Sequence, residues 1–146
     1  MAAENNKAID EAKIRALRDD LANALRAKDA DGVTSHYAAD IAMFVLATSL
    51  HHATGDNASP KMGIEEWFSS FQGSIGYEIR DLNITTGDDV AFCHSLNRIS
   101  GTRSDGEKVE MWVREALCFC KIDGKWKITH QQQFVTQKYM FLFKRA

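Results

Sequence analysis

The sequence is poor in proline and cysteine, with one proline, Pro60, and three cysteines among 146 residues. The cysteines, at positions 93, 118 and 120, are too few and too unevenly spaced for a disulfide framework or a zinc knuckle. We interpret them as small buried hydrophobic residues. His51 and His52 are adjacent but have no visible third ligand, so we predict neither a metal site nor a cofactor.

The chain also lacks an excess of basic charge and any long apolar run. Its formal net charge of −2 excludes a basic field that would attract nucleic acid or an anionic membrane. No apolar run is long enough to cross a bilayer, and the N-terminal segment lacks the apolar core of a signal peptide. We therefore expect a cytoplasmic protein without nucleic-acid or membrane partners.

The composition, with 45% hydrophobic and 26% charged residues, is that of an ordinary globular protein. A length of 146 residues suits one domain with a sizeable core. We expect residues 1–146 to form a single domain, with residues 1–8 disordered and residues 46–59 in a long loop.

Helical periodicity is confined to the first half of the chain. Residues 9–27 repeat isoleucine and leucine at three- and four-residue steps, which predicts a helix with one apolar face. Asp29 or Asp31 can cap a short second helix that runs through Tyr37, and residues 41–45 are a strand candidate.

A third helix is predicted to begin after residue 59. Ser59 suits its N-cap and Pro60 its first position, and Gly73 is expected to end it. Its apolar stripe consists of Ile64, Trp67, Phe68 and Phe71. Such a stripe is typical of a core-facing helix.

The second half of the chain has the pattern of strands. Residues 77–86 and 90–102 are two candidates, and Asp105-Gly106 marks a turn into the next one. Residues 109–135 contain two β-favouring runs joined by Asp123-Gly124, which is a strong signal for a two-residue hairpin turn.

If both Asp-Gly pairs are two-residue turns, they fix the pairing of three strands. Glu115 then lies between Leu96 and Gln132 on the face that the helices should cover, which we name the inner face. The predicted inner face comprises Phe92, His94, Leu96, Arg98, Val113, Glu115, Leu117, Phe119, Ile128, His130, Gln132 and Phe134.

Five polar side chains interrupt this apolar face: His94, Arg98, Glu115, His130 and Gln132. One interpretation is structural, with an Arg98–Glu115 ion pair and two hydrogen-bonded histidines. The other is a polar floor in an apolar cavity, where Glu115 is a base and His94 or His130 an acid or donor. For that cavity we predict ligand contacts from Phe44, Trp67, Phe71, Arg98, Gln132 and Phe134.

The opposite, outer face of the sheet is predicted to carry Ile99, Trp112, Arg114 and Cys118. Exposed tryptophan and isoleucine on a sheet face indicate a partner surface, and we expect a homodimer there. Alternatively, the apolar C-terminal residues 139–143 fold over this face.

Four segments resemble the cone-fold superfamily of ketosteroid isomerase, scytalone dehydratase, the nuclear transport factor and SnoaL-type polyketide cyclases. They are residues 31–40 (DGVTSHYAAD), 66–68 (EWF), 87–94 (GDDVAFCH) and 113–130 (VREALCFCKIDGKWKITH). The chain is similar to the SnoaL-like, ketosteroid-isomerase-homologue proteins of bacteria over nearly its whole length up to residue 130. The resemblance implies an α+β, cystatin-like cone, in which a strongly curved, mixed but mostly antiparallel sheet wraps around about three N-terminal helices.

The resemblance does not carry over the catalytic residues of ketosteroid isomerase. Alignment on residues 37–40 places the general base at Val45, the oxyanion-hole tyrosine at Leu21 and the protonated aspartate near Leu117. None of these side chains does acid–base chemistry. The last strand of the relatives reads His-Glu-His-x-Ser-Val-Pro, whereas residues 130–136 here read HQQQFVT, so a site built on that histidine pair is altered.

Three functions follow from these observations, because this superfamily hosts several on one scaffold. The first is binding of a small apolar molecule in the cone, with no assignable reaction. The second is an isomerase, cyclase or dehydratase that uses Glu115 with His94 or His130. The third is a dimeric association domain whose cone is filled.

Overall fold

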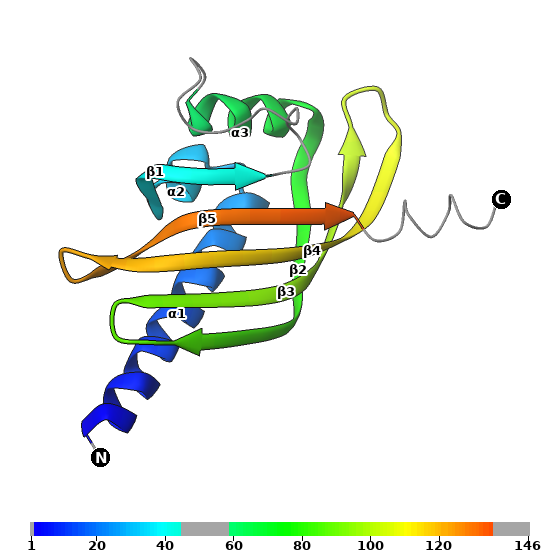
Figure 1. Cartoon of the computed structure of the whole chain (residues 1–146). Helices are drawn as coiled ribbons and strands as arrows, with labels where there is room; N and C mark the ends of the chain where they lie inside the picture. The colour runs from blue at the N-terminus through cyan, green and yellow to red at the C-terminus, as the bar shows by residue number, and fades with distance from the viewer. Residues whose placement is uncertain (1, 45–58, 136–146) are drawn as a thin grey trace, which may run out of the picture.

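Three helices and five strands make up residues 2–44 and 59–135, the part of the chain that this computed structural model describes (Figure 1). The helices are α1 (Ala2–Arg26), α2 (Ala30–Thr34) and α3 (Pro60–Ser69). The strands are β1 (Tyr37–Phe44), β2 (Phe71–Thr86), β3 (Val90–Arg103), β4 (Lys108–Ile122) and β5 (Lys125–Val135). They form one sheet in the order β1-β5-β4-β3-β2, antiparallel except for the parallel pair β1 and β5. The predicted α+β class with a curved, mostly antiparallel mixed sheet is confirmed.

The long helix α1 runs along one face of the sheet, while α2 and α3 lie near one end of it (Figure 1). It begins at Ala2, so residues 2–8, which we expected to be disordered, belong to this helix. Its buried stripe contains Ile14, Leu17 and Leu21, as the periodicity predicts. The same stripe also contains a fully buried arginine, Arg18.

The predicted caps of the two short helices are confirmed. The Asp29 side chain accepts a hydrogen bond from the Gly32 amide at the start of α2, and the Ser59 hydroxyl accepts one from the Met62 amide at the start of α3. Pro60 occupies the first turn of α3.

The predicted ends of α2 and α3 are wrong by a few residues. Tyr37 begins β1 instead of ending α2, and α3 ends at Ser69, so Phe71 belongs to β2. Gly73 lies within β2 at a φ of 64°, near an irregularity in the pairing with β3. Of the predicted 46–59 loop only Ser59 is described. The remainder, with His51 and His52, and the C-terminal apolar segment lie outside the described residues.

The two Asp-Gly turns have different geometries. Asp123 and Gly124 form the predicted two-residue turn, with φ values of 51° and 77° and Ile122 paired with Lys125. The β3–β4 connection is instead a three-residue loop, residues 104–106, in which the Arg103 amide donates to the Glu107 carbonyl oxygen over 2.7 Å. The predicted β3–β4 register is therefore wrong by one residue, and Asn97 rather than Arg98 pairs with Val113.

A bulge changes the register of β5 as well. Ile128 pairs with Phe119 as predicted, but His130 pairs with Cys118, which leaves Thr129 as an extra residue. Beyond this point, each β5 side chain lies on the face opposite to the predicted one. A one-residue shift has this effect because successive side chains alternate between faces.

An anchor near its N-terminal end ties α1 to the β4–β5 hairpin. The Trp126 indole N–H donates to Asp10 Oδ1 over 3.2 Å, and the Lys121 ammonium lies 3.3 Å from the same oxygen. Asp10 and Trp126 are both buried. The carboxylate thus satisfies the indole donor where the helix crosses the hairpin.

We predict that Asp10→Ala lowers the free energy of unfolding by about 1–3 kcal/mol, because it leaves the buried Trp126 N–H without its acceptor. Urea unfolding monitored by circular dichroism measures this. The control is Glu11→Ala, since the Glu11 side chain is half-buried (46% exposed) and pairs with Arg15 at the surface. We expect this variant to stay within about 0.5 kcal/mol of the parent. Equal effects of the two substitutions would contradict the role of the anchor.

Candidate functional site

The Glu115 carboxylate lies at the centre of the inner face. It is only 3% exposed and stands on β4 between Val113 and Leu117, which share its face and are both buried. The inner-face position predicted for Glu115 is confirmed. Isolated buried carboxylates are costly, so its surroundings decide what it can do.

The partner of Glu115 is Arg18 of α1, which is 0% exposed. Arg18 Nη2 lies 3.0 Å from Glu115 Oε1, and both side chains are enclosed. Arg18 follows Ile14 by four residues and precedes Leu21 by three, so the helical repeat places it on the apolar face. The guanidinium therefore enters the core from the helix, opposite the carboxylate of the sheet.

Two further strands contribute polar groups on the same side. The Tyr77 hydroxyl, from β2, lies 3.3 Å from Arg18 Nη2 and 3.4 Å from Glu115 Oε1. The Asn97 amide, from β3, donates to Tyr77 over 2.7 Å and to Glu115 Oε1 over 3.1 Å. The Ser95 hydroxyl donates to the side-chain oxygen of Asn97, Oδ1, over 2.8 Å, and this bond orients the Asn97 amide.

The second carboxylate oxygen is bound from β5. Gln131 and Gln133 donate to Glu115 Oε2 over 2.9 Å and 2.7 Å. The Tyr37 hydroxyl, at the start of β1, donates to Gln131 over 3.3 Å. We call the complete set the Arg18–Glu115 cluster: Arg18, Tyr37, Tyr77, Ser95, Asn97, Glu115, Gln131 and Gln133.

The protonation states in this cluster follow from burial and charge. Burial alone lowers the pKa of Arg18, but the neighbouring Tyr77 and Glu115 outweigh it and raise the pKa, so the guanidinium stays charged. Burial and the Glu115 charge raise the pKa of Tyr77 and of Tyr37, so both phenols stay neutral.

The two members of the ion pair differ in how completely their polar atoms are hydrogen-bonded. Glu115 accepts hydrogen bonds at both oxygens, whereas Arg18 Nε and Nη1 are buried and have no acceptor among the described residues. Buried donors in folded proteins are nearly always paired with protein or water. The cluster therefore contains two donor nitrogens of a buried, charged group for which the described part of the chain supplies no acceptor.

Most of the other predicted site residues lie on the outer face. These are Phe44, His94, Arg98, His130, Gln132 and Phe134. For those on β3 and β5, the reason is that both register predictions are wrong by one residue. Arg98 pairs with Glu110 over 3.0 Å instead of with Glu115. His130 lies against the ring of Phe44, with centroids 5.6 Å apart. Neither histidine therefore shares the face of Glu115, and the structure does not form the predicted acid–base pairs.

The same correction moves one predicted interface residue inward. Ile99 is 3% exposed and pairs with Tyr77 on the inner face. Trp112 and Cys118 are half-buried and Arg114 is exposed on the outer face, as predicted. On the helical side, the rings of Trp67 and Phe71 pack edge to face with centroids 5.3 Å apart.

Sequence reasoning missed most of the cluster, although signals for parts of it exist. Arg18 occupies the apolar stripe of a predicted helix, and a charge in that place indicates a buried partner. The predicted register puts Asn97, Gln131 and Gln133 on the outer face, and a one-residue change brings all three inward together. Tyr77 has no such signal, since its strand pairs irregularly with β3.

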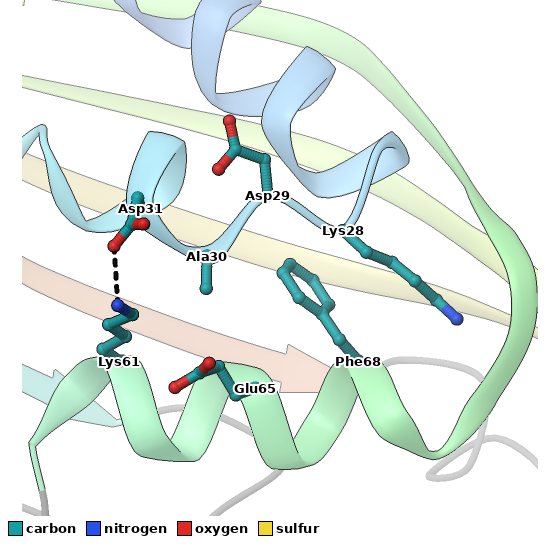
Figure 2. Close-up of a pocket in the computed structure, with 7 residues that line it drawn as sticks. All are labelled: Lys28, Asp29, Ala30, Asp31, Lys61, Glu65 and Phe68. Carbon is teal, nitrogen blue, oxygen red and sulfur yellow. Dashed lines mark ion pairs between the residues drawn. The ribbon is translucent and has the colours of Figure 1, made fainter.

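A concave region lies between the end of α1, α2 and α3, and Figure 2 shows its lining residues. This open hollow of about 400 Å³ is lined by Lys28, Asp29, Ala30, Asp31, Lys61, Glu65 and Phe68. Its Lys61 and Asp31 form an ion pair of 2.8 Å. The hollow contains no predicted site residue and no member of the Arg18–Glu115 cluster.

Two kinds of feature are not found within residues 2–44 and 59–135. No three histidine, cysteine, aspartate or glutamate side chains in this part of the chain gather as metal ligands would. None of the helices described there is long and apolar enough to span a membrane.

Helices packed on the inner face of a curved, mostly antiparallel sheet define the class as a cystatin-like α+β cone. A family model for the SnoaL-like domain matches residues 14–135. The chain therefore belongs to the SnoaL-like family. No protein with a curated description matches the sequence.

Solved structures show the same fold at low identity. An NTF2-like protein of unknown function from Pseudomonas putida KT2440 is 24% identical, with a TM-score of 0.76 over 86% of each chain. An NTF2-like protein with a cystatin-like fold from Novosphingobium aromaticivorans is 13% identical, with a TM-score of 0.69 over 92% of this chain and 86% of that one. The association domain of C. elegans CaMKII is 16% identical, with a TM-score of 0.65 over 88% of this chain and 98% of that one. At these identities the likeness concerns the fold alone.

We predict that Glu115→Gln and Arg18→Met each lower the free energy of unfolding by roughly 3–5 kcal/mol, because each leaves a buried charge without its counter-charge. The double variant should lose clearly less than the sum of the two, since no uncompensated charge remains. Guanidinium unfolding of the four proteins gives the coupling.

The matched control is Arg15→Met, one turn from Arg18 on the exposed side of α1. This variant should stay within about 0.5 kcal/mol of the parent. Additive losses for Arg18 and Glu115 would contradict the coupling.

Proposed function

We propose that the protein binds a small, largely apolar molecule inside the cone, against the Arg18 guanidinium. One observation carries this proposal: a fully buried, charged side chain retains two donors without an acceptor among the described residues. Leaving buried donors unpaired is costly. A bound molecule with an acceptor removes that cost.

The surroundings of the cluster support an apolar ligand. Val113, Leu117 and Ile99 are all buried on the inner face around the polar groups. Few polar groups within a mostly apolar lining are the usual composition of a small-molecule site.

The alternative of catalysis through Glu115 is less well supported. Its two oxygens together accept from five side chains, so accepting a substrate proton would require breaking these contacts. The donors are Arg18, Tyr77, Asn97, Gln131 and Gln133. The predicted partners His94 and His130 lie on the other face of the sheet.

A third candidate is a pure association domain, a role found on this fold in the association domain of C. elegans CaMKII. A role in association alone would account for the exposed apolar side chains of the outer face, but it gives no role to the two buried donors of Arg18, Nε and Nη1. We therefore favour ligand binding in the interior.

Side-chain NMR tests the proposal directly. Neutral and charged aromatic compounds are screened for a rise in Tm, and hits are added to protein labelled with ¹⁵N. We expect the Arg18 Nε–H signal to shift with a hit, and a ligand at 100 times its Kd to add about 2.7 kcal/mol of stability. The internal control is Arg26 Nε–H, which already donates to the Tyr77 carbonyl oxygen over 2.9 Å and should not shift. A full screen that moves neither Tm nor the Arg18 signal would sink the proposal.

We further propose that two copies pair through the outer face. Phe44, Phe92 and Phe134 each expose about half of their side chains there, and Phe134 is 58% exposed. Trp112, Arg114 and Cys118 occupy β4 between them. Exposed aromatic side chains on one face of a sheet favour an isologous interface.

We predict that Phe134→Glu shifts the protein from a dimer to the 16.4 kDa monomer in sedimentation equilibrium, because it places a charge in the apolar contact. The control is Met62→Glu, since Met62 is equally exposed (59%) but lies on α3. The interface proposal fails if the parent protein is a monomer, or if Met62→Glu dissociates it as Phe134→Glu does.

A further inference from the structure

The Arg18–Glu115 cluster is electrically neutral before any ligand binds. It contains one cation, Arg18, and one anion, Glu115, at 3.0 Å. Its other members are two phenols, a hydroxyl and three amides, all uncharged at neutral pH. A ligand that enters this buried region therefore finds no net charge to neutralise.

The cluster is unbalanced in hydrogen bonding instead. Every contact that Glu115 receives comes from a donor, and its two oxygens already accept from five side chains. Arg18 keeps Nε and Nη1 as donors without acceptors among the described residues. The cluster therefore lacks a hydrogen-bond acceptor for these two nitrogens of Arg18.

From these two observations we infer that the ligand is an uncharged molecule that carries a carbonyl or hydroxyl oxygen, which accepts from Arg18. A carboxylate would place a second negative charge beside Glu115 in a region closed to solvent. A hydrocarbon would leave both donors unpaired. The inference rests on the proposed interior binding and specifies which chemical class the interior accepts.

Three aromatic probes of similar shape separate the classes. They are 2-acetylnaphthalene, which is neutral with a carbonyl, 2-naphthoate, which is an anion, and 2-ethylnaphthalene, which has no oxygen. We expect 2-acetylnaphthalene to bind at least about tenfold more tightly than either of the others in calorimetric titration. Only this probe should move the Arg18 Nε–H signal.

A variant then reverses the preference. Glu115→Gln removes the anion but keeps the size of the side chain, so Arg18 becomes a buried cation without a counter-charge. In this variant 2-naphthoate should bind about tenfold or more tightly than 2-acetylnaphthalene, because the ligand carboxylate takes the place of Glu115. The matched control is Glu110→Gln, the same change at an exposed position of β4, which should keep the parental preference.

A second variant keeps the test valid if Glu115→Gln does not fold. The double variant Arg18→Met/Glu115→Gln has no buried charge, and in it 2-acetylnaphthalene should lose its advantage over 2-ethylnaphthalene. A retained advantage would overturn the role of Arg18.

The outcomes distinguish the inference from the function on which it rests. Equal or tighter binding of 2-naphthoate to the parent protein overturns the neutral-ligand inference and leaves interior binding standing. Failure of all three probes, while a charged or oxygen-free compound of the screen moves the Arg18 signal, also overturns the inference alone; a neutral compound with a carbonyl or hydroxyl oxygen that moves this signal supports it. Failure of every compound overturns both.

Discussion

The fully enclosed pair of Arg18 and Glu115 is the constraint on which the interior depends. Removing two charges from water costs several kcal/mol each, and attraction over 3.0 Å offsets this only when further hydrogen bonds are present. Those bonds come from Tyr77, Asn97 and the glutamines of β5. One carboxylate thus connects α1 to four strands, and its contacts require a particular register in each of them.

Because of this dependence, the register between the strands matters more for forming the Arg18–Glu115 cluster than the order of helices and strands along the chain. Hydrophobic pattern, caps and the Asp123-Gly124 turn are local, so the α+β class, the start of α3 and the inner position of Glu115 could all be predicted. The length of the loop at residues 104–106 and the bulge at Thr129 are not local. They are selected by packing across the sheet, and each turns a whole run of side chains to the other face.

The resulting errors in the predicted site follow from these two shifts. His94 and Arg98 on β3 and His130 and Gln132 on β5 exchange faces with neighbours that are smaller or are amides, such as Asn97 and Gln131. Amides can enclose a carboxylate without adding charge, whereas a histidine or a second arginine would also have to be neutralised. Besides Glu115, Arg18 was the member of the cluster that could be predicted, because its position relative to Ile14 and Leu21 follows from the helical repeat alone.

The distribution of donors also decides between two roles for the carboxylate. A general base needs a lone pair directed at the substrate and a neighbour that holds or passes on the proton. The lone pairs of Glu115 accept hydrogen bonds from side chains that hold the carboxylate in place, and its negative charge is paired with Arg18. The polar atoms of the cluster that lack a partner among the described residues are Nε and Nη1 of Arg18. On the proposed interior binding, a ligand would therefore be recognised through a hydrogen-bond acceptor rather than through proton transfer to Glu115.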